Sequence, residues 1–169
     1  MNESEGFVQK RHQPIQELEQ PRPLTLVVPP MRSQVNLSRI VRAASCLGVT
    51  RIIACGQAKI DRKIARDAAD MVDLQVHRSL PPVIDKLLNE GLRLVGLEQC
   101  TGSHLIYDYS FDRQTALVVG NERLGIEPEI LEKLDDVIEI PVHGLPYSFN
   151  AATATIIAVY EYCRQFPSG

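Results

Sequence analysis

The sequence predicts an α/β domain whose sheet is mostly parallel, with helices on both faces. Short apolar runs rich in β-branched residues alternate with segments in which apolar residues recur at helical spacing. Alternation of this kind is typical of a parallel sheet that is covered on both sides. A length of 169 residues, with 44% hydrophobic and 23% charged residues, suits one globular domain with a real core.

The first half of the chain predicts three strands and two helices. A strand is expected at 24–28, ended by Pro29 and Pro30, and a helix at 36–47, ended by Gly48. The next strand is 51–55, followed by a turn at Gly56. A short alanine-rich helix is expected at 63–71, and the alternating residues 72–76 predict a third strand.

The second half predicts three more strands and three more helices. Ser79 caps a helix that stops at Gly91, and another helix is expected at 126–134, with Pro128 in its first turn. Strands are expected at 93–98, 115–119 and 137–140. The final helix, 150–164, is apolar or small nearly all round, which predicts burial on every side. In so small a domain this indicates a partner subunit, and the alternative is a single central core helix.

Residues 1–23 differ in kind from residues 24–169, which form the predicted domain. They are rich in Gln, Glu and Pro, lack apolar periodicity and are expected to form a flexible arm. Its cations could contact a polyanion, although a solvated tail is the simpler explanation; they are Lys10, Arg11, His12 and Arg22.

Several classes of protein are not expected. No apolar run approaches a membrane span and the N-terminus lacks a secretory pattern, so we expect a cytoplasmic protein without a membrane partner. The four cysteines show no C-x-x-C spacing and the four histidines no H-E-x-x-H, so no metal site is expected. The glycine-rich phosphate motifs G-x-G-x-x-G and G-x-x-x-x-G-K-[ST] are absent as well.

Basic residues gather in one window although the net charge is −3. Between residues 31 and 66 the only acid is Asp61, and the cations are Arg32, Arg39, Arg42, Arg51, Lys59, Arg62, Lys63 and Arg66. This asymmetry suggests an anion-binding face, and the alternative is a solvated helix face.

Two apolar strands end abruptly in polar loops that contain glycine. The loops at the carboxyl ends of parallel strands form the ligand crevice of such folds. One pocket is therefore expected to be lined by Gly120, Asn121, Glu122, Ser148 and Asn150.

Three segments in order resemble one family. They are Asn36-Leu-Ser-Arg-Ile-Val-Arg42-Ala-Ala-Ser-Cys-Leu-Gly48-Val, Gly120-Asn-Glu-Arg-Leu-Gly125-Ile and Ile140-Pro-Val-His-Gly144-Leu-Pro-Tyr-Ser148-Phe-Asn150. Together they resemble the SpoU-type RNA 2′-O-ribose methyltransferases of the SPOUT superfamily, over residues 24–165.

The resemblance implies a C-terminal deep trefoil knot that binds S-adenosylmethionine, and a homodimer with its active site at the subunit interface. The positions that match the family's cofactor site are Leu97, Glu98, Gly120, Ile140, Ser148 and Phe149. The family usually has leucine where Phe149 stands. The positions that match its catalytic residues are Asn36, Arg42, Glu122, Ser148 and Asn150. RNA contacts are expected from Arg32, Arg39, Arg42, Arg62, Lys63 and Arg66.

Methyl transfer to a ribose needs positioning of the 2′-hydroxyl and a way to take up its proton. Arg42 is expected to orient the hydroxyl and the neighbouring phosphate, because an arginine guanidinium stays protonated and is therefore a poor base. Glu122 is the other candidate for proton uptake. The expected substrate is tRNA, at a D-loop guanosine, followed by ribosomal RNA and a wobble nucleoside. The alternatives from other classes are a catalytically silent RNA-binding dimer and a base methyltransferase.

Overall fold

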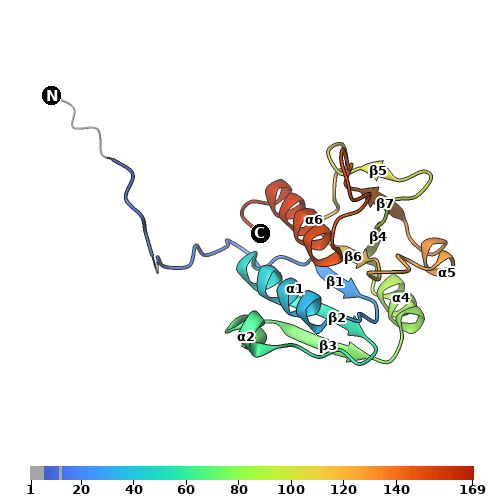
Figure 1. The fold of residues 1–169 in the computed structure, drawn as a ribbon, viewed down its shortest axis with the longest axis horizontal. Helices are drawn as coiled ribbons and strands as arrows, with labels where there is room; N and C mark the ends of the chain where they lie inside the picture. Colours follow the sequence, from blue (N-terminus) through green and yellow to red (C-terminus); the bar gives the residue numbers. More distant parts are fainter. Residues whose placement is uncertain (1–5, 12) are drawn as a thin grey trace.

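The computed structural model describes residues 6–11 and 13–169, and the first five residues and His12 of the predicted arm lie outside that range. A seven-stranded parallel sheet forms the centre of the molecule, with strand order β3-β2-β1-β6-β4-β7-β5 (Figure 1). Its strands are β1 (Thr25–Val28), β2 (Arg51–Cys55), β3 (Asp73–His77), β4 (Arg93–Leu97), β5 (His104–Leu105), β6 (Thr115–Val119) and β7 (Asp136–Glu139). Every neighbouring pair is parallel, which confirms the predicted fold class.

Helices cover both faces of the sheet, because its central strands β1, β2, β4 and β6 are buried on both sides. The helices are α1 (Gln34–Cys46), α2 (Arg62–Ala65), α3 (Ala68–Met71), α4 (Leu80–Asn89), α5 (Pro128–Leu131) and α6 (Ala151–Gln165). Leu26 and Val28 face the core under α1, α2, α3 and α6, whereas Val27 between them faces the core under α4 and α5. On the face covered by α1, α2, α3 and α6, the helices α1 and α6 lie side by side (Figure 1).

The predicted helix at 63–71 is wrong as a single element. It is broken into α2 and α3 at Arg66, whose φ of 54° and ψ of −141° cannot continue an α-helix. No glycine or proline marks the break, so the local pattern did not reveal it. The strand β5 was also not predicted, because two residues are too short to show a period.

The sequence predicted that the final helix is buried on every side, and this prediction is wrong for a single chain. Its inner face is buried against the sheet and α1, through Ala152, Thr155, Ala158, Val159, Tyr162 and Cys163. On its outer face Thr153, Tyr160 and Arg164 are exposed, and Ile156 and Ile157 are half-buried. The alternative of a central core helix is therefore wrong, since α6 is an outer-layer helix with an uncovered apolar flank.

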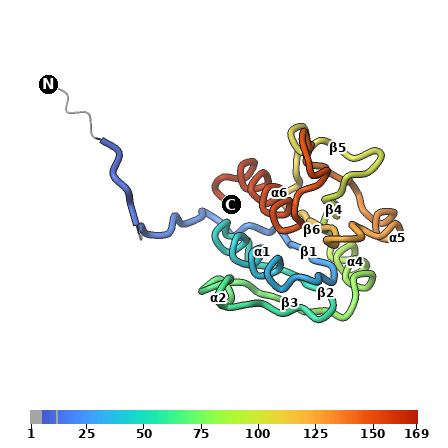
Figure 2. The backbone as a smooth tube through the Cα atoms, in the orientation of Figure 1, coloured from blue at the N-terminus to red at the C-terminus, as the bar shows by residue number. Residues whose placement is uncertain are grey.

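The described part of the N-terminal arm, residues 6–11 and 13–23, has neither helix nor strand, and it runs away from the sheet (Figure 2). Its end packs beside the C-terminus, where the Glu19 amide donates to Ser168 O at 3.0 Å. Arg22 is buried and donates to the carbonyl oxygens of Leu47, Phe166 and Pro167. Arg22 therefore fastens the end of the arm to the domain and is not available to a polyanion.

Candidate active site

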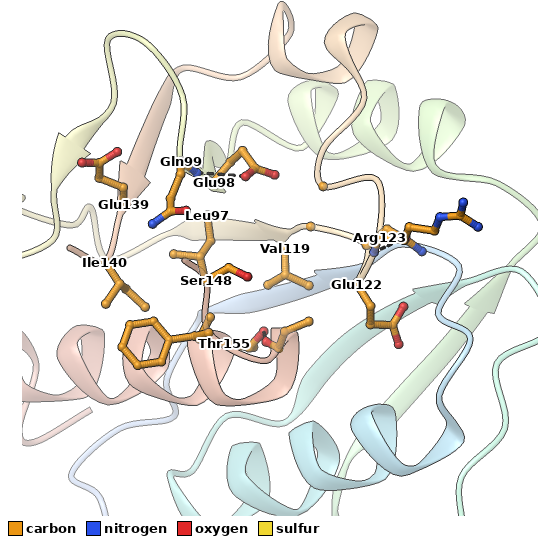
Figure 3. Close-up of a pocket in the computed structure, with 16 residues that line it drawn as sticks. Leu97, Glu98, Gln99, Val119, Glu122, Arg123, Glu139, Ile140, Ser148 and Thr155 are labelled. Atoms are coloured by element: carbon orange, nitrogen blue, oxygen red, sulfur yellow. Dashed lines mark hydrogen bonds between the residues drawn. The ribbon is translucent and has the colours of Figure 1, made fainter. Parts of the chain in front are cut away.

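A cavity of about 240 Å³ opens at the carboxyl ends of β4, β6 and β7 (Figure 3). These strands are neighbours in the sheet, so the loops that follow them meet at one edge. The N-terminal part of α6 closes the cavity on the face of the sheet that α1 and α6 cover, through Ala151, Ala154 and Thr155. All six residues predicted to hold a cofactor line it: Leu97, Glu98, Gly120, Ile140, Ser148 and Phe149.

The loop after β6 is a tight turn that only glycine permits. The backbones of Asn121 and Gly125 exchange two hydrogen bonds, of 2.9 and 3.1 Å. Gly125 has a φ of 67°, and a Cβ added to it would lie 2.3 Å from Glu98 Oε2. The same oxygen accepts the Ile126 amide at 2.9 Å. Glu98 therefore holds the backbone of this loop. Gly120 and Gly125, which have no side chain, let the loop backbone pass close to the Glu98 carboxylate.

Asn121 ties the same loop to the connection between β1 and α1. Its Oδ1 accepts the amides of Arg123 and Leu124 at 2.9 and 3.1 Å, and its Nδ2 donates to Pro30 O at 2.6 Å. The sequence predicted Asn121 in the pocket, and the structure gives it this positioning role.

Glu122 extends from the loop toward α1 (Figure 3). Its carboxylate accepts the backbone amides of Arg32 and Ser33 at 3.3 and 3.2 Å, and Asn36 Nδ2 at 3.2 Å. Partial burial raises the pKa of Glu122, but these hydrogen bonds together lower the pKa by more than burial raises it. The pKa of Glu122 therefore lies below its usual value. Glu122 is therefore ionised at neutral pH and is a weak base.

Asn36 and Asn150 join the starts of the two outer helices. Asn36 is buried in the first turn of α1, which Ser33 caps. Asn150 caps α6, since its Oδ1 accepts the amides of Ala152 and Thr153 at 3.0 and 3.2 Å. Asn150 Nδ2 also donates to Asn36 Oδ1 at 3.2 Å. Three of the predicted catalytic residues thus form one chain of hydrogen bonds, Asn150 to Asn36 to Glu122. Of the three, Glu122 lines the cavity, whereas Asn150, which the sequence predicted in the pocket, stands between the lining residues Phe149 and Ala151.

Arg42 does not join this network within one chain. It lies six residues beyond Asn36 on the exposed side of α1, and its Nη1 donates to Ile64 O at 3.4 Å. Arg39 is exposed on the same helix, and Arg32, Lys63 and Arg66 are exposed as well. Arg62 differs, because it forms a bidentate pair with Asp70, at 3.0 and 2.8 Å.

Several cavity residues were not predicted as cofactor ligands: Gln99, Val119, Arg123, Gly125, Glu139, Ala151, Ala154 and Thr155. The helical positions 151, 154 and 155 share the face that begins at the cap Asn150, so the helix spacing was the available signal. Among the described residues, no group of three or more His, Cys, Asp or Glu side chains could hold a metal. Nor does the described chain contain a helix with the length and apolarity to cross a membrane.

The family model described as the SpoU rRNA Methylase family matches residues 23–160. The chain belongs to this family. The tRNA (guanosine(18)-2′-O)-methyltransferase of Aquifex aeolicus is 33% identical over 142 residues, which is 80% of this chain and 66% of that protein. The 23S rRNA (guanosine-2′-O-)-methyltransferase of Coxiella burnetii is 31% identical, over 84% of this chain and 58% of that protein.

Solved structures of SpoU proteins have the same fold. The A. aeolicus TrmH/SpoU tRNA modifying enzyme matches with a TM-score of 0.82 and 28% identity, over 89% of this chain and 78% of that chain. The SpoU methyltransferase AviRb from Streptomyces viridochromogenes, solved with its cofactor AdoMet, matches with a TM-score of 0.73 and 26% identity, over 92% and 64%. The chain spans 66% and 58% of the lengths of the two curated relatives from A. aeolicus and C. burnetii, respectively.

Proposed function

We propose that the protein is an S-adenosylmethionine-dependent RNA 2′-O-ribose methyltransferase. The proposal rests on one observation: two of the three segments that resemble the family's motifs line one cavity, and the first segment is joined to them by the hydrogen bonds of Asn36 with Glu122 and Asn150. A catalytically silent RNA-binding protein would not need this arrangement.

The cavity residues suit the cofactor. Leu97, Val119, Ile140 and Phe149 offer apolar walls for an adenine ring, and the backbone of the two loops offers polar groups at the edge. Phe149 is half-exposed, so its ring can cover one side of a bound base. When bound, S-adenosylmethionine supplies the methyl group on its sulfonium.

Arg42 is the residue we propose to orient the target ribose, and it requires a second copy of the chain. Within one chain Arg42 lies on the outer side of α1, away from the cavity. The uncovered flank of the neighbouring helix α6 is apolar, with Tyr160 65% exposed. A homodimer formed through this layer would cover Tyr160 and could bring Arg42 to the partner's cavity. The deep trefoil knot of the C-terminal segment stays a prediction.

The substrate we propose is tRNA, at a guanosine of the D-loop, and we expect the protein to act in the cytoplasm. The tRNA relative from Aquifex aeolicus supports this choice, and the ribosomal RNA relative supports ribosomal RNA as the second candidate. The arm, whose described residues Lys10 and Arg11 are exposed, is proposed to be flexible up to its end, where Glu19 and Arg22 bind the domain at 24–169.

Two measurements test the proposal. Calorimetric titration of the folded protein with S-adenosylmethionine and with S-adenosylhomocysteine should give saturable heat at one site per chain. Incubation with unmodified tRNA and ribosomal RNA, followed by mapping of ribose methylation, should then identify the modified nucleotide. A folded protein that binds neither compound would overturn the enzyme proposal and favour a silent RNA-binding dimer.

A further inference from the structure

A second cavity lies beside the first, at the carboxyl ends of β1 and β2, and has a volume of about 180 Å³. Its floor is apolar and buried, through Val28, Leu37, Ala54 and Cys55. Its rim is polar and comes from two loops, with Arg32, Ser33 and Gln34 on one side and Gln57 and Lys59 on the other. No aspartate or glutamate of the described part of the chain lines it.

The cavity is built by a close contact between the two loops. Gly56 has a φ of 76°, and a Cβ added there would lie 2.9 Å from Pro30 Cβ. The Gly56 amide also donates to His77 O at 2.8 Å, which holds the loop after β2 against the sheet. The loop that carries Gln57 and Lys59 is therefore pressed against the connection between β1 and α1, and the depression between them is part of the folded structure.

The two cations at the rim have no acidic partner among the described residues. Neither the Arg32 guanidinium nor the Lys59 ammonium forms an ion pair or a side-chain hydrogen bond there, whereas Arg51, Arg62 and Arg93 all do. Glu122 contacts this segment through its backbone only, since the carboxylate accepts the amides of Arg32 and Ser33. Two unpaired cations over an uncharged, partly apolar pocket favour an anionic ligand with a flat apolar part.

The position of this cavity connects it to the proposed reaction. Ser33 lines the second cavity and Glu122 lines the first, and the hydrogen bond between them forms the wall that the two cavities share. In the order β2-β1-β6-β4 the two cavities are about two strand spacings apart, roughly 10 Å. An RNA strand with its target ribose at the first cavity can cover that distance within a few nucleotides.

We infer that the second cavity is a subsite for a nucleotide of the RNA that flanks the methylated one, an inference that rests on the proposed function. Arg32 and Lys59 bind its phosphate, as cations do in RNA-binding proteins. The amides of Gln34 and Gln57 bind the edge of its base, which is how unstacked bases in single-stranded RNA are read. The buried floor receives the face of the base. The subsite thus contributes to the choice of RNA, while the first cavity performs the chemistry.

The test is RNA affinity, measured separately from activity. Binding of labelled, unmodified tRNA and of a labelled ribosomal RNA fragment is followed by fluorescence anisotropy at several salt concentrations, for wild type, Lys59→Gln and Gln57→Ala. Lys86→Gln is the matched control, since Lys86 lies on α4, on the opposite face of the sheet, beside Glu90. All three side chains are exposed, and far-ultraviolet circular dichroism confirms folding.

Lys59→Gln is expected to weaken binding of the preferred RNA about tenfold and to reduce the salt slope by about 0.7 to 1, the value for one phosphate contact. Gln57→Ala is expected to weaken binding several-fold with the slope unchanged. Both should raise the KM for RNA and leave kcat and the affinity for S-adenosylmethionine as in wild type. Wild-type affinity and slope in both variants, or equal losses in Lys86→Gln, would overturn the subsite.

The outcomes separate this inference from the proposed function. A protein that loses RNA affinity in the two variants but never binds S-adenosylmethionine would support the subsite and overturn the methyl transfer. A protein that methylates RNA normally in both variants, with an unchanged KM, would keep the methyl transfer and overturn the subsite.

Discussion

Asn36 and Glu122 are 86 residues apart in the chain and meet where Asn36 Nδ2 donates to Glu122 Oε1 at 3.2 Å. The contact joins the start of α1 to the loop after β6, and through Asn150 it reaches the start of α6. Glu122 also accepts two backbone amides, so its carboxylate fixes the relative placement of these three segments. We therefore expect Glu122 to position the site and not to take up the proton.

The first prediction concerns Glu122→Gln. The amide keeps the shape of the side chain but presents an NH₂ group to donors that need an acceptor, so the loop should shift while the fold remains. We expect methyl transfer to fall by roughly 10²-fold, the order seen when a preorganised polar group is lost. Single-turnover methylation measures it, and Glu127→Gln, an exposed glutamate in the same region without a cap hydrogen bond, is the control.

The pH dependence checks the same role. Because the pKa of Glu122 is lowered in the folded protein, its stabilising contribution is full above the ordinary value of 4.5 and is lost as the pH falls through the lowered pKa. Activity should therefore show no loss from Glu122 between neutral pH and about pH 5. An acidic limb near neutral pH that disappears in Glu122→Gln would show that Glu122 is the base after all.

The second prediction concerns Gly125→Ala. A Cβ at this position would meet Glu98 Oε2 at 2.3 Å, and the φ of 67° strains any residue with a side chain. We expect a cost of about 1–3 kcal/mol in the free energy of unfolding, and a loss of affinity for S-adenosylmethionine of tenfold or more. Chemical denaturation and calorimetry measure the two effects. Gly144→Ala is the control, since nothing lies within 4 Å of its added Cβ, and equal behaviour of the two variants would contradict the prediction.

The third prediction concerns Arg42→Lys. A structural cation could be replaced by lysine with little loss, whereas a bidentate contact to ribose and phosphate could not, because lysine lacks the planar fork. We expect the fold, the dimer and cofactor affinity to be kept and methyl transfer to fall by roughly 10²-fold or more. Arg39→Lys, exposed on the same helix, should be much milder. Near-normal turnover of Arg42→Lys would mean that only a positive charge is needed there.

The fourth prediction concerns assembly. Wild type should be a dimer at micromolar concentration by light scattering, with a large apolar interface. Tyr160→Glu should shift it toward monomer and reduce methyl transfer, because it places a charge on the uncovered flank of α6 without disturbing a buried residue. Tyr107→Glu, with Tyr107 70% exposed in the segment between β5 and β6, is the control and should remain dimeric. A monomeric wild type would refute both the dimer and the shared site.

The sequence determined the order of the elements and the composition of the cavity. Periodicity records which side of a segment is buried, so six strands and most of the helices could be predicted with small errors at their ends. Glycine and a polar residue after an apolar strand mark a loop that cannot belong to the core, and this signal predicted Gly120, Glu122 and Ser148 at one site. The break at Arg66 and the strand β5 could not be predicted, because neither leaves a periodic signal.

Only the tertiary structure decided which side chains meet and what they do for one another. Arg22 looked like a free cation and is buried against three carbonyl oxygens, because the C-terminal end of α6 packs where the arm enters the sheet. The last helix looked buried on every side, yet one chain covers only its inner face. Glu98 and Gly125 form a close contact that neither residue's local sequence indicates. A local sequence reports the burial and conformation of each segment, whereas the partner of a polar group depends on how the whole sheet is ordered.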